Sequence, residues 1–173
     1  MRYPALGSGS RIPQSFYGKT AGARRMRLVL DPSVVIKFYI PEVLSDIAET
    51  LELAIQTAPH FVSVPALFYS EIGNIVWKKY VLRNHLSRAQ SQAIVRSMLK
   101  LPFEVIDDKV LMGDAFKIAV DFEITMHDAV YLACMRYTEG VFISADERLV
   151  NKVKRAPWAS RAVFLRNWGK AAD

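Results

Sequence analysis

Four acidic residues adjoin apolar segments, and three of them, Glu71, Asp128 and Asp146, have no basic partner at the spacings that would bring one onto the same helix face. Glu71 and Asp128 have only apolar or uncharged residues three and four positions away. Asp146 is followed by apolar residues at the same spacing, and Asp31 ends the apolar run 28–30. A buried carboxylate without a cation must protonate, reach a distant basic group or bind a metal ion. The four acids are therefore candidate ligands for a hard divalent cation, Mg²⁺ or Mn²⁺.

Other acids have a lysine or arginine within one helical turn, which is typical of solvated ion pairs. These acids are Asp114, Asp121 and Glu139. The four candidate ligands differ from them in this respect.

Strands and helices alternate from residue 26 onwards. Apolar stretches predict strands over residues 27–31, 60–64, 103–106, 141–144 and 162–165. Helices are predicted over residues 33–39, 41–57, 65–83, 87–100, 108–122, 125–137 and 146–153, with Gly140 as the C-cap of the sixth. This alternation predicts an α/β fold with a mostly parallel central sheet that is covered by helices on both faces.

Such a sheet would bring the four acids to one edge, because ligands bind beyond the carboxyl ends of parallel strands. Asp31 ends the first strand, and Asp146 follows the strand 141–144 by two residues. Glu71 comes near the start of the helix after the second strand, and Asp128 lies in the first turn of the helix 125–137. We therefore predict one acidic, cation-binding site.

Three of the acids also have structural explanations. Asp128 could cap its helix with Thr125, Asp146 could favour a helix dipole, and Asp31 could close a turn with the following proline. Glu71 is the hardest to explain in this way. The prediction depends on all four acids occurring together.

The net charge of +6 comes mainly from residues 1–25, which contain five lysines and arginines and no acid. The rest of the chain is nearly neutral, so its charge does not by itself indicate nucleic-acid binding. We expect residues 1–25 to be a disordered extension, or the product of a start codon assigned too far upstream of Met26. Residues 26–173 are then expected to form a single domain.

The other bulk properties exclude several classes of protein. The longest apolar runs are far shorter than the roughly 20 residues that span a bilayer, so we expect no membrane segment. The single cysteine, Cys134, cannot form an internal disulfide, which favours a reducing, cytoplasmic location. Its apolar surroundings also make Cys134 a poor nucleophile.

Four segments together resemble the PIN-domain ribonucleases, in particular the VapC-like toxins of type II toxin–antitoxin pairs. The segments are Leu30-Asp31-Pro-Ser33-Val-Val-Ile-Lys37-Phe-Tyr-Ile-Pro41-Glu42, Ser70-Glu71-Ile-Gly-Asn74, Thr125-Met-His-Asp128-Ala129-Val-Tyr131-Leu-Ala133 and Ile143-Ser144-Ala-Asp146-Glu-Arg-Leu149. They occur in the family's order, and the likeness covers residues 27–165. His127 and Ser144 depart mildly from residues common in the family, and neither is a presumed ligand.

The resemblance implies a PIN-like three-layer α/β/α fold and a ribonuclease that hydrolyses RNA phosphodiester bonds. Asp31, Glu71, Asp128 and Asp146 would hold Mg²⁺ or Mn²⁺. Ser33 and Ser144 would orient the carboxylates, although Ser33 could equally be only a helix N-cap. The implied partners are an RNA substrate, a cognate VapB-like antitoxin and a second copy of the chain in a homodimer.

Further residues are assigned from their types and positions. Two basic clusters are candidates for RNA contacts: Lys78, Lys79 and Arg83 in one helix, and Arg148, Lys152, Lys154 and Arg155 near another. Lys37 is expected to face solvent, and His127 is a candidate general base. The amphipathic helices between Pro41 and Lys100, with Trp77, Tyr80 and Leu82, could supply the dimer face, with Trp77 expected in the core.

Three alternatives remain at this point. The chain could be an RNA-processing nuclease of the same fold without an antitoxin, or a catalytically silent PIN module that binds RNA or protein. A phosphatase of the haloacid dehalogenase type would need a second aspartate two residues after Asp31. Ser33 occupies that position.

Overall fold

The sheet contains five parallel strands in the order β3-β2-β1-β4-β5. The computed structural model describes residues 26–58 and 60–169, so the predicted extension at residues 1–25 lies outside the described residues. The strands are β1 Arg27–Leu30, β2 Phe61–Pro65, β3 Glu104–Ile106, β4 Val141–Ser144 and β5 Ala162–Phe164. The α/β class and the parallel sheet predicted from the sequence are confirmed.

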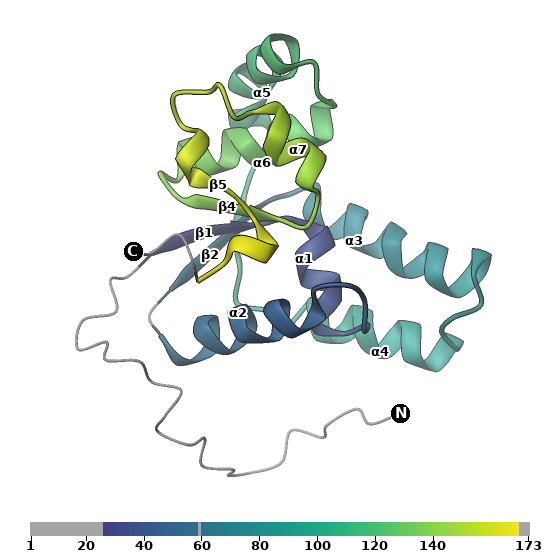
Figure 1. Ribbon diagram of the computed structural model, residues 1–173. Helices are drawn as coiled ribbons and strands as arrows, with labels where there is room; N and C mark the ends of the chain where they lie inside the picture. The colour runs from purple at the N-terminus through teal and green to yellow at the C-terminus, as the bar shows by residue number, and fades with distance from the viewer. Residues whose placement is uncertain (1–25, 59, 170–173) are drawn as a thin grey trace.

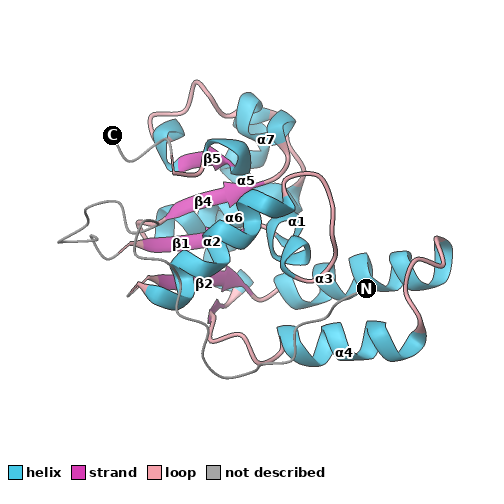
Figure 2. Ribbon diagram, turned by 60° about the horizontal axis from the view of Figure 1, so that its bottom comes forward, coloured by secondary structure: helices cyan, strands magenta, loops and turns pink. Residues whose placement is uncertain are grey.

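Helices cover both faces of this sheet (Figure 1). The helical segments are α1 Pro32–Val35, η2 Ile36–Phe38, α2 Ser45–Thr57, α3 Phe68–Trp77, η3 Lys78–Leu82, α4 Arg88–Met98, α5 Asp108–Phe122, α6 Met126–Tyr137, α7 Glu147–Lys152, η4 Ala159–Arg161 and η5 Leu165–Asn167. One layer contains α5 and α6, and α2 lies in the layer on the opposite side of the sheet. Helices α3 and α4 extend from the body side by side, and we call residues 68–98 the arm (Figures 1 and 2).

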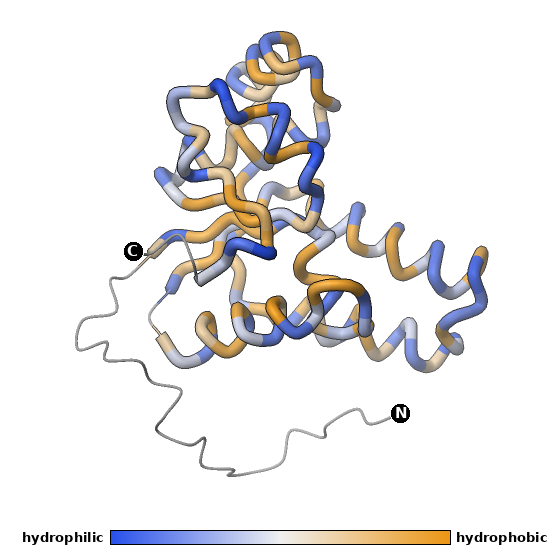
Figure 3. The backbone as a smooth tube through the Cα atoms, viewed as in Figure 1, coloured by the Kyte–Doolittle hydropathy of each residue, from blue (hydrophilic) through white to orange (hydrophobic). Residues whose placement is uncertain are grey.

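Helix α6 lies at the centre of the fold. Seven consecutive residues of this helix, from Ala129 to Met135, are buried, because the helix is packed between the sheet and α5. Strand β1 is equally apolar, with Leu28, Val29 and Leu30 fully buried. Figure 3 shows hydrophobic residues along the central strands and again on α5, the outermost helix of its layer. No helix among the described residues is long and apolar enough to cross a membrane.

Two predicted helices begin later than expected. The helix predicted from residue 41 begins at Ser45, because Leu44 has a left-handed backbone with φ 71°. The helix predicted from residue 65 begins at Phe68, because Pro65 belongs to β2. Its last part, η3, is a π-helix, in which the Arg83 N–H donates to the Lys78 carbonyl.

The expected role of Gly140 was also wrong in its detail. The left-handed residue after α6 is Glu139, with φ 53°. The N–H of Gly140 donates to the Met135 carbonyl and that of Glu139 to the Arg136 carbonyl, which is a Schellman ending. A Cβ at position 140 would lie 3.0 Å from the Arg27 carbonyl oxygen, a tight contact that favours glycine at this site.

Trp77 is not a core residue, contrary to the prediction. It lies at the end of α3 and is 49% exposed. The local spacing of apolar residues does not reveal that the arm leaves the body of the fold, so Trp77 finds no second layer to pack against.

Candidate active site

The ends of β1 and β4 form the centre of the candidate site. From β1 the chain adds β2 and β3 on one side of the sheet and then returns to place β4 and β5 on the other. This reversal creates a crevice at the carboxyl ends of the two neighbouring strands. The Asp31 N–H donates to the Ile143 carbonyl oxygen at 3.0 Å and ties the two ends together.

Asp31 is the N-cap of α1. Its Oδ1 accepts a hydrogen bond from the Ser33 N–H at 2.7 Å. Burial raises the pKa of Asp31 to about 6, although hydrogen bonds from Ser33 lower it. The negative charges of Asp128 and Glu71 raise it further, so both carboxylates lie within electrostatic reach of Asp31.

Glu71 lies in the first turn of α3 and has two side-chain partners from α6. Its Oε2 accepts a hydrogen bond from the Tyr131 hydroxyl at 2.8 Å. Its Oε1 lies 3.2 Å from Nδ1 of His127, whose side chain is largely exposed. Burial and then the charge of Glu71 raise the pKa of the Tyr131 phenol far above its ordinary value, so this group remains a donor.

Asp128 only partly follows the prediction that it caps its helix together with Thr125. Thr125 is the N-cap of α6, and its Oγ1 accepts from the Asp128 N–H at 3.2 Å. The Thr125 hydroxyl also donates to Oδ2 of Asp128 at 2.8 Å. The carboxylate is therefore fixed by a side chain and does not close a capping box through the backbone of Thr125.

Asp146 is at the same edge but is exposed and serves as the N-cap of α7. Its Oδ1 accepts from the N–H groups of Arg148 and Leu149 at 2.8 and 3.2 Å. Its charge is not among those that raise the pKa of Asp31. Of the four predicted ligands, Asp128 and Glu71 thus act electrostatically on Asp31, and Asp146 lies at the same edge in a capping role.

Ser33 connects the two backbone segments that carry Asp31 and Asp146, and Ser144 bonds locally within the second. The Ser33 Oγ accepts from the Ala145 N–H at 3.1 Å, and the Ser144 Oγ accepts from the Asp146 N–H at 3.0 Å. A side-chain hydrogen bond from Ser33 also reaches Asp31. The N-cap of α1 is Asp31, so the alternative role of Ser33 as that cap was wrong.

The donor set fits a hard divalent cation. Within residues 26–58 and 60–169, no three His, Cys, Asp or Glu side chains are arranged so that they could hold a metal ion as they stand. The chemistry of the site nevertheless favours a cation, because Asp31, Glu71 and Asp128 offer only carboxylate oxygens and the charges of Glu71 and Asp128 act on Asp31. A divalent cation would relieve the resulting repulsion.

Sequence reasoning missed one residue of this site and predicted the wrong surroundings for two lysines outside it. The hydroxyl of Tyr131 was not predicted, although it is the only polar group on the fully buried stretch of α6 from 129 to 133. Lys37 does not face solvent, and Lys79 is buried, because both bind Glu42. Lys152 donates to the Glu123 carbonyl at 2.7 Å.

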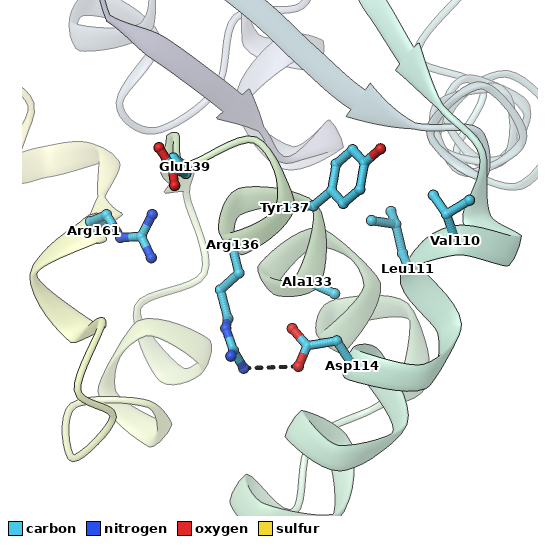
Figure 4. Close-up of a pocket in the computed structure, with 8 residues that line it drawn as sticks. All are labelled: Val110, Leu111, Asp114, Ala133, Arg136, Tyr137, Glu139 and Arg161. Atoms are coloured by element: carbon cyan, nitrogen blue, oxygen red, sulfur yellow. Dashed lines mark hydrogen bonds and ion pairs between the residues drawn. The ribbon is translucent and has the colours of Figure 1, made fainter.

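A cavity of about 640 Å³ lies away from the acids, at the opposite end of α6 (Figure 4). Its lining includes Tyr137, Arg161 and the ion pair between Arg136 and Asp114, whose atoms are 2.9 Å apart. Basic and acidic groups are balanced there. None of the four candidate ligands lines this cavity.

Comparison with known proteins identifies the family of this fold. Residues 28–155 match the PIN domain family. The chain is 26% identical over 129 residues to Ribonuclease VapC3 of Pyrobaculum aerophilum. This match covers 73% of the chain and 95% of the relative.

Three solved structures share the fold. The crystal structure of PAE2754 from Pyrobaculum aerophilum has a TM-score of 0.61 and 19% identity, covering 85% of this chain and 90% of that one. A toxin–antitoxin complex from Klebsiella pneumoniae has a TM-score of 0.53 and 15% identity, covering 75% and 92%. VapBC2 from Rickettsia felis, bound to a DNA fragment from its promoter, has a TM-score of 0.54 and 15% identity, covering 80% and 97%. The family match spans well over half of the sequence, and the chain belongs to the PIN domain family.

Proposed function

We propose that this protein is an Mg²⁺- or Mn²⁺-dependent endoribonuclease whose site is formed by Asp31, Glu71, Asp128 and Asp146. One observation carries the proposal: the carboxyl of Asp31, at the crevice of a PIN fold, has a pKa raised by burial and by two neighbouring carboxylates. Natural proteins keep such a repulsive cluster at functional sites. The name of the relative Ribonuclease VapC3 supports RNA as the substrate.

The chain's own residues then have distinct tasks. When bound, the cation supplies Lewis acidity toward the phosphodiester. Asp31 becomes fully ionised beside it, because a positive charge lowers a carboxyl pKa. The hydroxyls of Tyr131 and Thr125 orient Glu71 and Asp128, as residues behind metal ligands commonly do.

Asp146→Asn separates a ligand role from a capping role. Asparagine caps a helix about as well as aspartate, so α7 should keep its start and the free energy of unfolding should change little. As a ligand, Asp146 would lose its charge, and we expect Mn²⁺-dependent cleavage of structured RNA to fall at least roughly tenfold. The assay compares the wild type with and without EDTA against this variant.

Each outcome of that assay has a meaning. Cleavage that survives EDTA would contradict metal dependence. A variant as active as the wild type would leave Asp146 with only its helix cap. Asp121→Asn, which removes an exposed acid of α5, is the matched control and should leave cleavage unchanged.

Two groups of exposed apolar residues suit two partners. On the arm, Trp77, Val81 and Leu82 are each about half exposed or more. The same arm carries Glu71 at its base, so a peptide bound along it would reach the candidate site. We assign this surface to the segment of a VapB-like antitoxin that blocks the site.

The second surface is the outer face of α5, where Met112, Phe116 and Val120 are 46%, 62% and 61% exposed. These residues are four apart and form one stripe along the helix. A two-fold axis at Phe116 would pair α5 with an antiparallel copy and bring Met112 against the copy's Val120. It would also bring Lys109 against the copy's Glu123. This charge match leads us to place the homodimer contact on α5, in place of the helices between Pro41 and Lys100 considered from the sequence.

Phe116→Glu should convert the dimer into a monomer. The change puts two like charges at the centre of the two-fold contact, where they repel each other. Size-exclusion chromatography with light scattering measures the mass. Leu82→Glu on the arm is the control and should remain dimeric, and a dimeric Phe116→Glu protein would exclude α5 as the contact.

The antitoxin distinguishes this proposal from an RNA-processing nuclease of the same fold. A small neighbouring gene that encodes a DNA-binding protein would indicate a toxin–antitoxin pair. A catalytically silent PIN module is the remaining alternative, and the absence of Mn²⁺ binding in solution would favour it.

A further inference from the structure

Glu42 binds two lysines that come from two different helical segments. Its Oε2 lies 2.8 Å from Nζ of Lys37, and its Oε1 accepts a hydrogen bond from Nζ of Lys79. The side chains of Lys37 and Lys79 are only 9% and 11% exposed, and that of Glu42 is 28% exposed. We call these three residues the Glu42 bridge.

Each lysine of the bridge lies on the same continuous segment as one of the predicted ligands. Asp31 caps α1, which continues directly into η2 with Lys37. Glu71 lies in α3, which continues directly into η3 with Lys79. At a rise of 1.5 Å per residue, the bridge is roughly 9–12 Å along these segments from the carboxylates.

The local backbone is shaped to form this contact. Lys79 lies within the π-helical turn, a rare structure that is frequent at functional sites. Glu42 is fixed by Ser45, whose Oγ accepts from the Glu42 N–H at 2.9 Å, and the loop then needs the left-handed Leu44. Two backbone irregularities thus bring one carboxylate between two nearly buried ammonium groups.

The Glu42 carboxylate keeps the charges of Lys37 and Lys79 apart. One negative charge separates two positive charges, and α1 packs directly against α3. Although burial raises the pKa of Glu42, its hydrogen bonds to Lys37 and Lys79 lower it below the usual range, so the carboxylate is ionised. Without that charge, two nearly buried ammonium groups would repel each other across the α1–α3 contact.

We infer that Glu42 is a positioning residue, which sets the separation of α1 and α3 and thereby the spacing of Asp31 and Glu71. The inference rests on the proposed function, because the spacing matters only if both carboxylates hold one cation. As a positioning residue, Glu42 would contact neither the cation nor the RNA. Its effect is expected in metal affinity and kcat, with little change in KM for RNA.

The test compares Mn²⁺ binding by calorimetry and RNA cleavage in the full chain and its variants. Glu42→Gln is nearly isosteric and should lower both Mn²⁺ affinity and kcat roughly 10–100-fold, the range typical of residues that orient metal ligands. The double variant with Glu42→Gln and Lys79→Gln should regain most of the loss, because a single ammonium has nothing to repel. Glu49→Gln, an exposed change on α2, is the matched control and should behave as the wild type.

Several outcomes would overturn the inference while leaving the proposed function intact. A folded Glu42→Gln protein with wild-type affinity and kcat would show that the bridge only stabilises the fold. A double variant as impaired as Glu42→Gln would exclude repulsion between the lysines. Failure of the wild type itself to bind Mn²⁺ would instead contradict the proposed function.

A second measurement does not depend on metal or RNA. Nitroxide labels at Val43→Cys and Asn74→Cys, both exposed, report the distance between the loop of Glu42 and α3 by electron paramagnetic resonance. Glu42→Gln should lengthen or broaden that distance, and an unchanged distribution would overturn the inference. Cys134 should stay unlabelled, because it is buried and burial raises the pKa of its thiol to about 12.

Discussion

Asp31→Asn is expected to abolish RNA cleavage and at the same time to make the metal-free protein more stable. The loss of activity follows from the loss of a ligand charge at the centre of the site. It should exceed the roughly 10–100-fold loss typical of residues that only orient a ligand. Asparagine can still accept the hydrogen bond from the Ser33 N–H, so α1 keeps its cap.

The gain in stability follows from the pKa of Asp31, which burial above all raises from 3.8 to about 6. Between about pH 4 and pH 6 the folded state binds this proton more tightly than the unfolded state. The stability of the metal-free protein therefore falls as the pH rises through that window. Above about pH 6 the folded state bears the full free-energy cost of an ionised, buried Asp31. That cost is on the order of 2–3 kcal/mol, and an uncharged asparagine avoids it.

Urea denaturation in EDTA at pH 4, 5, 6 and 8 measures this effect. The wild type should lose stability between pH 4 and 6 relative to Asp31→Asn, and the variant should be the more stable protein at pH 8. Adding Mn²⁺ should stabilise the wild type and leave the variant unchanged, because only binding to the folded state adds stability. A variant less stable than the wild type at pH 8 without metal would show that Asp31 is not strained in the free protein.

The parts of the site that follow strand ends could be predicted from the sequence. Asp31 directly follows a buried strand and Asp146 comes two residues after another, and the carboxyl ends of parallel strands meet at one edge. The positions of Glu71 and Asp128 follow from the helices after the second strand and before the fourth. Apolar periodicity and capping residues were sufficient for these elements, since both are local properties of the chain.

Contacts between distant parts of the chain could not be predicted in this way. Tyr131 and Glu71 are 60 residues apart, and Lys79 and Glu42 are 37 apart. Their meeting depends on how α6, α3 and the loop before α2 pack, which no local pattern records. The exposure of Trp77 was missed for the same reason.

Tyr131→Phe is expected to lower Mn²⁺ affinity and kcat roughly 10–100-fold without removing any ligand. The hydroxyl donates to Oε2 of Glu71 from a fully buried position, and phenylalanine fills the same space without a donor. Among the residues that the structure describes, Glu71 then keeps only the exposed His127 as a side-chain partner and loses its fixed orientation. A hydrogen bond to a charged group contributes about 1.5–3 kcal/mol, so the free energy of unfolding should also fall by an amount of that order.

Calorimetry with Mn²⁺, RNA cleavage and urea denaturation measure these effects in one preparation. Tyr137→Phe is the matched control, because its ring lies on the same helix but is 62% exposed and far from the acids. A Tyr131→Phe protein with lower stability but unchanged Mn²⁺ affinity would show that the hydroxyl stabilises the fold and does not orient Glu71. Loss of affinity in Tyr131→Phe but not in Tyr137→Phe would instead assign the Tyr131 hydroxyl to the metal site. That hydroxyl would then fix Glu71, the ligand that the arm supplies, from the buried face of α6.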